Sequence, residues 1–128
     1  MNKTCFVEMA FDPRFQGIWE HVIKPTVEGL GDKCIRADDF FTVGSILQDI
    51  FNSINNSDYI IAELTIHNPN VYYELGYSHA LNKKVILLTQ DISTLPFDLR
   101  HQRVIVYSDN ASGISKLKTD LTNFINKL

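Results

Sequence analysis

The chain has 128 residues, of which 45% are hydrophobic, and its 12 basic and 15 acidic residues give a net charge of −3. This length is typical of one domain with its own core, so we expect a single domain over residues 1–128. The acidic balance argues against a nucleic-acid partner, and the longest purely aliphatic run, 85–88, is too short to span a membrane. Because the first residues lack the apolar core of a signal peptide, the sequence predicts a cytoplasmic protein.

The reactive side chains form none of the common cofactor or metal motifs. The sequence has no P-loop, no dinucleotide-binding glycine motif and no nucleophile elbow, so NTPase, dehydrogenase and serine-hydrolase chemistry lack support. Its four histidines lie at spacings that no metal motif uses, and no CxxC accompanies them. Cys5 and Cys34 fall in predicted strands and are interpreted as buried, reduced thiols. We therefore expect neither a metal nor a cofactor.

Short apolar runs alternate along the chain with longer amphipathic stretches. The short runs predict strands at 4–9, 33–37, 59–64, 84–89 and 103–107. The amphipathic stretches predict helices at 17–30, 45–54, 68–81 and 114–128. Strands that alternate with helices are joined by right-handed crossovers and form a parallel sheet. The sequence therefore predicts an α/β fold, namely a flavodoxin-like three-layer sandwich with a five-stranded parallel sheet in the order 2-1-3-4-5.

The predicted helices carry local start and stop signals. Ser45 and Gln48 form a capping-box pattern, and Asn68 followed by Pro69 is a typical N-cap and first turn. Pro25 lies inside the first predicted helix, where we expect a kink. One apolar face of the second predicted helix is formed by Ile46, Leu47, Ile50, Phe51 and Ile54.

In this fold class, ligands bind beyond the carboxyl ends of the strands. The segments that follow the first four predicted strands are 10–16, 38–45, 65–74 and 90–102. The residues in them that attract attention are Asp38, Asp39, Gly44, Ser45, Asn68, Asn70, Glu74, Asp98, Arg100 and His101.

Glu74 stands out among them. It lies one helical turn after Asn70 and is flanked by bulky apolar residues. Near a helix start, the helix dipole favours the ionised form of a carboxylate. An ionised carboxylate beside a cleft serves as a nucleophile or stabilises an oxocarbenium-like transition state. The alternative interpretation is a solvated helix glutamate.

Two acidic groups and one helix start offer further contacts for a ligand. Ser45 and Asp49 share one face of the second predicted helix, and free N–H groups after Gly44 can bind a phosphate. The alternative is a plain capping serine with a surface aspartate. Asp38 and Asp39 can accept hydrogen bonds from ribose hydroxyls, or they can simply cap the helix that follows.

Several segments together resemble one family. The sequences YIIAELT at 59–65, NPNVYYELGYSHAL at 68–81 and KVILL at 84–88 resemble the nucleoside 2-deoxyribosyltransferase-like superfamily. Its bacterial TIR-like branch is similar in CFVEMAFDP at 5–13, IRADD at 35–39, GSI at 44–46 and PFDLR at 96–100. The resemblance extends from residue 5 to about residue 107, and the YELG helix motif is its most specific part.

This resemblance implies chemistry at an N-glycosidic bond. Members of the superfamily hydrolyse or transfer the base of a nucleoside or nucleotide, and TIR relatives cleave nicotinamide from NAD. By resemblance, Glu74 is the catalytic carboxylate and Asp49 contacts the sugar. Met9 and Phe11 would line the base or sugar pocket, and Ser45 would cap a phosphate or ribose. The branch usually reads D-L-T where this chain has Glu63-Leu64-Thr65, which adds a methylene.

Two function classes remain open. The first is an enzyme that cleaves a nucleotide, a nucleoside or NAD, as a hydrolase or a base transferase. The second is a non-catalytic, nucleotide-sensing TIR-like signalling module in bacterial defence. The presence of both Glu74 and Asp49 favours the enzyme, because a retired pocket need not keep them.

The aromatic residues of the third predicted helix predict self-association. Tyr72, Tyr73 and Tyr77 give this helix more aromatic surface than one helix of a small domain usually buries, and such residues are enriched in interfaces. Members of the superfamily also complete their sites across subunit contacts. We therefore predict a homodimer or a higher homo-oligomer.

Overall fold

The computed structural model of the chain describes residues 2–37 and 45–128. Its strands form one parallel sheet of five strands in the order β2-β1-β3-β4-β5. They are β1 (Thr4–Glu8), β2 (Lys33–Arg36), β3 (Tyr59–Glu63), β4 (Lys84–Thr89) and β5 (Val104–Val106). The predicted fold class and strand order are confirmed.

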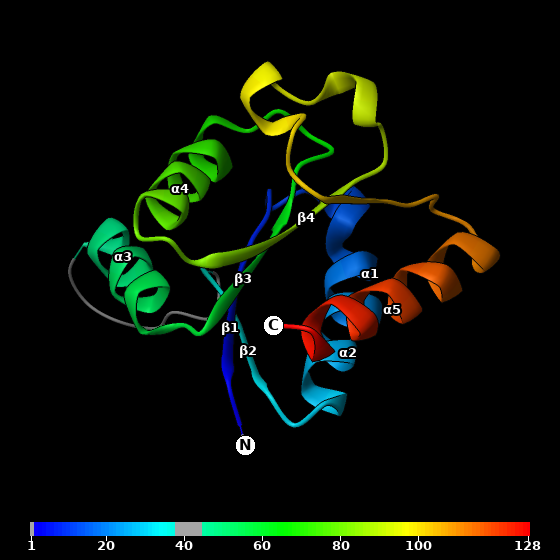
Figure 1. Cartoon of the computed structure of the whole chain (residues 1–128), viewed down its shortest axis with the longest axis horizontal. Helices are drawn as coiled ribbons and strands as arrows, with labels where there is room; N and C mark the ends of the chain where they lie inside the picture. Colours follow the sequence, from blue (N-terminus) through cyan, green and yellow to red (C-terminus); the bar gives the residue numbers. More distant parts are fainter. Residues whose placement is uncertain (1, 38–44) are drawn as a thin grey trace.

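Helices cover both faces of the sheet and give the molecule three layers. Figure 1 shows α3 and α4 on one face, and α1, α2 and α5 on the other. The helices are α1 (Gln16–Ile18), α2 (Lys24–Gly29), α3 (Ile46–Asn56), α4 (Pro69–Ala80) and α5 (Ala111–Asn126). Short 3₁₀ turns are η1 (Pro13–Phe15), η4 (Ile92–Thr94) and η5 (Phe97–Leu99). In the part of the chain that the structure describes, no helix is both long and apolar enough to cross a bilayer.

The first predicted helix contains an irregular turn where the sequence predicts a kink. A π-helical segment, η2 (Trp19–Ile23), joins α1 to α2, and its Lys24 N–H donates to the Trp19 carbonyl five residues earlier. Pro25 follows directly, and its ring would crowd an ordinary preceding turn. The wider π-helical turn accommodates this ring, so the irregularity is placed where expected but takes another form.

Several predicted boundaries shift by one to three residues. Each of the first three strands ends one residue earlier than predicted, because the chain leaves the hydrogen-bonded ladder at the edge where the loops begin. Helix α5 begins at Ala111 rather than 114, because Asn110 caps it through a 2.8 Å bond from Gly113 N–H to its side-chain oxygen. A Cβ at Gly113 would lie 2.1 Å from the Ser108 carbonyl oxygen, so this close turn requires glycine.

The amino end of the sheet is fixed by buried polar groups. The Asp32 carboxylate accepts a 2.8 Å bond from the Tyr59 hydroxyl and a 3.0 Å bond from the Lys3 N–H. Cys5 and Cys34 are register partners on β1 and β2, and both are free, buried thiols as predicted. This end of the sheet is therefore closed, which leaves the carboxyl ends of the strands for a site.

Candidate active site

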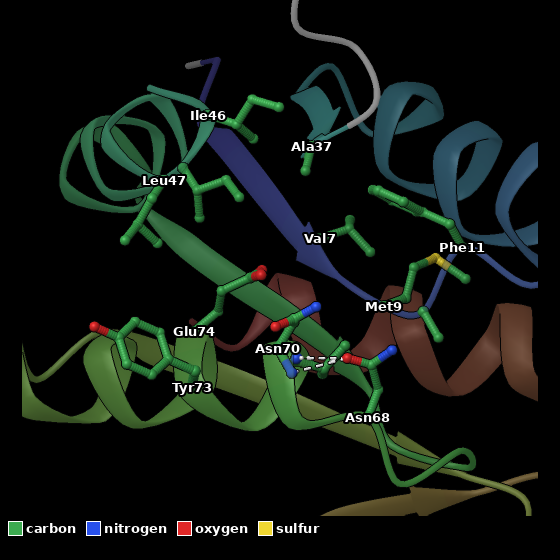
Figure 2. Close-up of a pocket in the computed structure, with 13 residues that line it drawn as sticks. Val7, Met9, Phe11, Ala37, Ile46, Leu47, Asn68, Asn70, Tyr73 and Glu74 are labelled. Carbon is green, nitrogen blue, oxygen red and sulfur yellow. Dashed lines mark hydrogen bonds between the residues drawn. The ribbon is translucent and has the colours of Figure 1, made fainter. Parts of the chain in front are cut away.

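A cavity of about 480 Å³ lies at the carboxyl ends of β1 and β2, between the first turns of α3 and α4 (Figure 2). Its volume falls in the range of about 300–1,000 Å³ that is typical of small-molecule sites. Asn68, Asn70 and Glu74 provide most of its polar lining. The remaining lining residues are apolar apart from Tyr73: Val7, Met9, Ala10, Phe11, Ala37, Ile46, Leu47, Ile50 and Val71.

The start of α4 places two polar side chains in this cavity. The Asn68 side-chain oxygen accepts bonds from Asn70 N–H at 2.9 Å and from Val71 N–H at 3.2 Å, which confirms the predicted N-cap. Asn70 and Glu74 are one turn apart, and Figure 2 shows both projecting from α4 into the cavity on the side that faces β1. The Asn68 oxygen thus serves the helix, whereas the side chains of Asn70 and Glu74 face the cavity.

Glu74 is half-buried, and its surroundings change its acidity. Burial raises the pKa of its carboxyl group to about 7. The expectation that the helix dipole favours the ionised form is therefore wrong, because desolvation beside apolar side chains outweighs the dipole. A carboxyl group with a pKa near neutrality is populated in both protonation states, as acid–base and nucleophilic catalysis require.

A second glutamate, which the sequence analysis missed, lies under α4. Glu8 is the last residue of β1, and its side chain is 0% exposed. Its Oε2 atom lies 2.6 Å from the Ser78 hydroxyl, and its Oε1 atom has no hydrogen-bond partner among the residues that the structure describes. Burial, together with the nearby charge of Glu74, raises the pKa of Glu8 to about 8. The signal in the sequence was a charged residue at the end of an otherwise buried strand.

Glu63, the residue that departs from the family pattern, lies on the other face of the sheet. Its carboxylate accepts hydrogen bonds from the Tyr107 hydroxyl and from Thr65 N–H. Gln90 completes this network, because its N–H donates to the Thr65 hydroxyl at 2.9 Å and its amide donates to the Tyr107 hydroxyl at 3.3 Å. Glu63 therefore ties together the ends of β3, β4 and β5 and does not line the cavity between α3 and α4.

The start of α3 presents apolar side chains to the cavity. Ser45 caps the helix, since its hydroxyl accepts a 3.3 Å bond from Gln48 N–H, and Asp49 is half-buried in the first turn. Ile46 and Leu47 line the cavity, whereas Ser45 and Asp49 are not among its described lining residues. The sugar and phosphate contacts of Ser45 and Asp49 stay predictions. Predicted contacts of Asp38, Asp39 and Gly44 lie outside the described residues.

Large apolar side chains surround the cavity and remain exposed. Phe11 is 62% exposed, Ile46 67% and Tyr73 60%, and Figure 2 shows them around the opening. Ile46 and Leu47 thus do not pack on the sheet with the rest of their helix face, of which Ile50 and Ile54 are buried. This exposed surface, which we call the apolar rim, consists of Phe11, Ile46, Leu47 and Tyr73.

Aromatic and cationic contacts hold the walls of the cavity. Phe51 of α3 stacks on Tyr77 of α4 with ring centroids 4.3 Å apart, and Asn55 donates a 2.7 Å bond to the Tyr77 hydroxyl. The buried Arg36 guanidinium lies 5.2 Å from the Phe11 ring centroid and 4.7 Å from that of Trp19. Tyr77 therefore packs within the chain, and the predicted oligomer stays a prediction.

Within residues 2–37 and 45–128, no group of three His, Cys, Asp or Glu side chains could hold a metal.

No family model matches the sequence, and no curated protein matches it. Solved structures do match. A CMP N-glycosidase from Clostridium botulinum superposes with a TM-score of 0.71 at 21% identity, over 93% of this chain and 98% of that one. A 2-deoxyribosyltransferase from Leishmania mexicana gives 0.60 at 22% identity, over 88% of this chain and 76% of that one. A prokaryotic SEFIR domain gives 0.61 at 16% identity, over 96% and 92%.

The chain shares the fold of these proteins. The sequence resemblance implies a fold like that of the deoxyribosyltransferases and the TIR-like domains, and the match to solved structures of both kinds confirms this fold. At these identities the likeness concerns the fold, and the function has to be argued from the cavity and its side chains.

Proposed function

We propose that the protein cleaves the N-glycosidic bond of a nucleoside, a nucleotide or NAD, by hydrolysis or by base transfer, with Glu74 as the catalytic carboxylate. The observation that carries this proposal is a half-buried carboxyl group with a pKa of about 7 that projects into an apolar cavity of ligand size. The structural likeness to a CMP N-glycosidase and to 2-deoxyribosyltransferases supports it.

The chemistry needs one ionised carboxylate next to the anomeric carbon. An ionised Glu74 attacks this carbon, the bond from the carbon to the base nitrogen breaks, and the base leaves with the electron pair. Water, or a second base, then attacks the same carbon and loses a proton, which the departed base or the solvent takes up, while the bond from the carbon to Glu74 breaks and frees the carboxylate. Two displacements at one carbon retain its configuration, which distinguishes this route from a direct attack by water.

The other lining residues suit a sugar that carries a flat base. Asn70 lies one turn before Glu74, and its amide offers both a donor and an acceptor to sugar hydroxyls. Phe11 and Tyr73 offer exposed aromatic rings on which a base can stack. In the proposal, Asp49 and Ser45 keep their predicted roles on the sugar and phosphate side.

The direct test is to incubate the protein with nucleosides, nucleoside monophosphates and NAD and to detect free base by chromatography. Glu74→Gln should lower turnover by at least about a hundredfold, because it removes the negative charge while keeping the size of the side chain. Substrate binding should change little, and the melting temperature should not fall, because Gln removes the cost of ionising a half-buried carboxyl group. Glu28→Gln, at an exposed position on α2, is the matched control and should leave turnover unchanged. A fully active Glu74→Gln protein would contradict the catalytic assignment.

The same assay decides between the two function classes. The fold similarity to a SEFIR domain favours a signalling module as the second candidate. In that case the cavity would bind a nucleotide without releasing its base. Tight binding by calorimetry, combined with no free base from any member of the panel, would therefore support the signalling module over the enzyme.

A further inference from the structure

The buried Glu8 side chain lies under the turn of α4 that carries Glu74. Successive residues of a strand point to opposite faces, so Glu8 and Val7 lie on opposite faces of β1. Helices α3 and α4 pack on the face that carries Glu8. Glu74 and Ser78 are one turn apart on the same side of α4, and Ser78 is fully buried against Glu8. Glu8 is not among the described residues that line the cavity, and the side-chain contact that links it to α4 is the one with Ser78.

The Ser78 hydroxyl touches two oxygen atoms but has only one hydrogen. Its oxygen lies 2.6 Å from Glu8 Oε2 and 3.0 Å from the carbonyl oxygen of Glu74. A carbonyl oxygen accepts only, and so does a carboxylate oxygen. One hydrogen cannot point straight at both oxygens, so two well-aligned hydrogen bonds require that Glu8 carries a proton and donates it to Ser78, which then donates its own hydrogen to the Glu74 carbonyl.

The surroundings of Glu8 also favour a neutral acid. Within residues 2–37 and 45–128 its buried Oε1 atom has no hydrogen-bond partner, which is far more costly for a charged carboxylate than for a neutral acid. The charged group on α4 that acts on Glu8 is another acid, Glu74, and burial lowers the pKa of His79 on the same helix, which disfavours its cationic form. Among the described residues, the charged neighbours on the adjacent strands, Arg36 and Glu63, face the other side of the sheet.

We propose that Glu8 is a neutral positioning residue for Glu74. Its carboxylic acid donates to the Ser78 hydroxyl, Ser78 donates to the Glu74 carbonyl, and this chain of hydrogen bonds fixes the turn that directs Glu74 into the cavity. The role assigned to Glu74 rests on the proposed function. The protonation of Glu8 does not, and it is measurable without any substrate.

The first experiment compares melting temperatures of wild type and Glu8→Gln between pH 5 and pH 9. The folded protein holds the Glu8 proton up to about pH 8, whereas the unfolded chain releases it near its ordinary pKa, so wild-type stability falls as the pH rises through this range. Glutamine has no such proton. We therefore expect the melting temperature of Glu8→Gln to exceed that of wild type by at least about 5 °C above pH 8, a gap that closes toward pH 5. The effect of burial on Glu74 is present in both proteins, so the gap between them reports mainly the Glu8 proton.

The second experiment separates positioning from packing by the release of base from the best substrate of the panel. Glu8→Leu fills similar space but cannot donate, and kcat should fall at least about tenfold while KM changes less than about threefold. Glu8→Gln keeps a donor for Ser78 and should stay within about threefold of wild type. Wild-type activity should fall above about pH 8, where Glu8 ionises and captures the Ser78 hydrogen, and Glu8→Gln should lack this fall.

Ser78→Ala tests the middle of the chain of hydrogen bonds. It should lower kcat about as much as Glu8→Leu, and the double variant should lose no more than either single variant, because both break the same chain.

A gap in melting temperature between Glu8→Gln and wild type that does not depend on pH would overturn the neutral state of Glu8. Equal kcat in Glu8→Leu and wild type, or additive losses in the double variant, would overturn its positioning role. If wild type releases no base, the proposed function fails and the stability experiment still decides the state of Glu8.

Discussion

Two buried glutamates at neighbouring strand ends, Glu8 on β1 and Glu63 on β3, have opposite hydrogen-bonding environments. Both are shielded from solvent, and burial raises the pKa of each. Both oxygens of Glu63 accept hydrogen bonds, one from the Tyr107 hydroxyl and one from Thr65 N–H. In the described part of the chain, one oxygen of Glu8 contacts the Ser78 hydroxyl and the other has no hydrogen-bond partner. The difference shows that the hydrogen bonds around a buried carboxyl, and not its burial alone, decide what it contributes.

The cavity lies on the side of the less satisfied glutamate. On the side of Glu63, loops after β4 and β5 supply donors, and the carboxylate holds three strand ends in place. On the side of Glu8, helix α4 supplies Ser78 and brings a second carboxyl, Glu74, close by. The cavity and the two carboxyl groups of raised pKa thus lie on the face where hydrogen-bond satisfaction is less complete, while hydrogen bonds on the opposite face join three strand ends.

Tyr107→Phe should give the largest effect on stability, because it breaks the satisfied side of this comparison. The substitution keeps the ring but removes the donor to a buried Glu63 oxygen. We expect the free energy of unfolding to fall by about 2 kcal/mol, the typical cost of leaving such a group unsatisfied. Urea denaturation measures it, with Tyr73→Phe at an exposed position as the control. A loss equal to that of the control would mean that Glu63 does not depend on this bond.

The pH dependence of activity sharpens the comparison on the cavity side. Because Glu74 has a pKa of about 7 and acts as an ionised nucleophile, kcat/KM should rise about fivefold from pH 6 to pH 7. Stability runs in the opposite direction, since the folded protein holds the Glu74 proton to a higher pH than the unfolded chain does. Glu74→Gln should abolish the part of the fall in stability with rising pH that the Glu74 carboxyl group causes. A rate profile that is flat between pH 6 and pH 8 would remove Glu74 from the rate-limiting step.

Leu47→Ser should affect binding alone, because the apolar rim is exposed in the free protein. Removing this side chain takes away apolar surface that a bound base would cover, so KM should rise about threefold to tenfold. The free energy of unfolding should stay within about 0.5 kcal/mol of wild type. Ile92→Ser, at an exposed position away from the cavity, is the matched control for KM. Equal KM values for both variants would place substrate away from the rim.

Tyr77→Phe should have the smallest effect. It removes the bond from Asn55 to the Tyr77 hydroxyl, which lies at the exposed edge between α3 and α4, and leaves the ring stacked on Phe51. We expect a loss of no more than about 0.5 kcal/mol in denaturation experiments, since water replaces an exposed bond. Tyr77→Ala, which also removes the stack, should cost clearly more. Similar losses for both variants would show that the hydroxyl, and not the ring, holds the two helices together.

The sequence by itself determined the order of the elements and the place of Glu74. Apolar runs and helix-start signals depend on residues within one turn or one strand, and the N-caps at Ser45 and Asn68 appear where these signals predict them. Parallel order follows from the alternation of strands and helices, which also brings the start of α4 to the carboxyl ends of the strands. For the same reason, Glu74 faces a cavity at this edge, as predicted.

Only the tertiary structure decided the electrostatics of the site. Glu8 and Ser78 are 70 residues apart, and Glu63 and Tyr107 are 44 apart, so no local pattern connects them. The raised pKa of Glu74 and the exposure of Ile46 likewise depend on which distant side chains cover each group. Burial and hydrogen-bond satisfaction are properties of the packed chain, because the free energy of a charge depends on everything around it rather than on its neighbours in sequence.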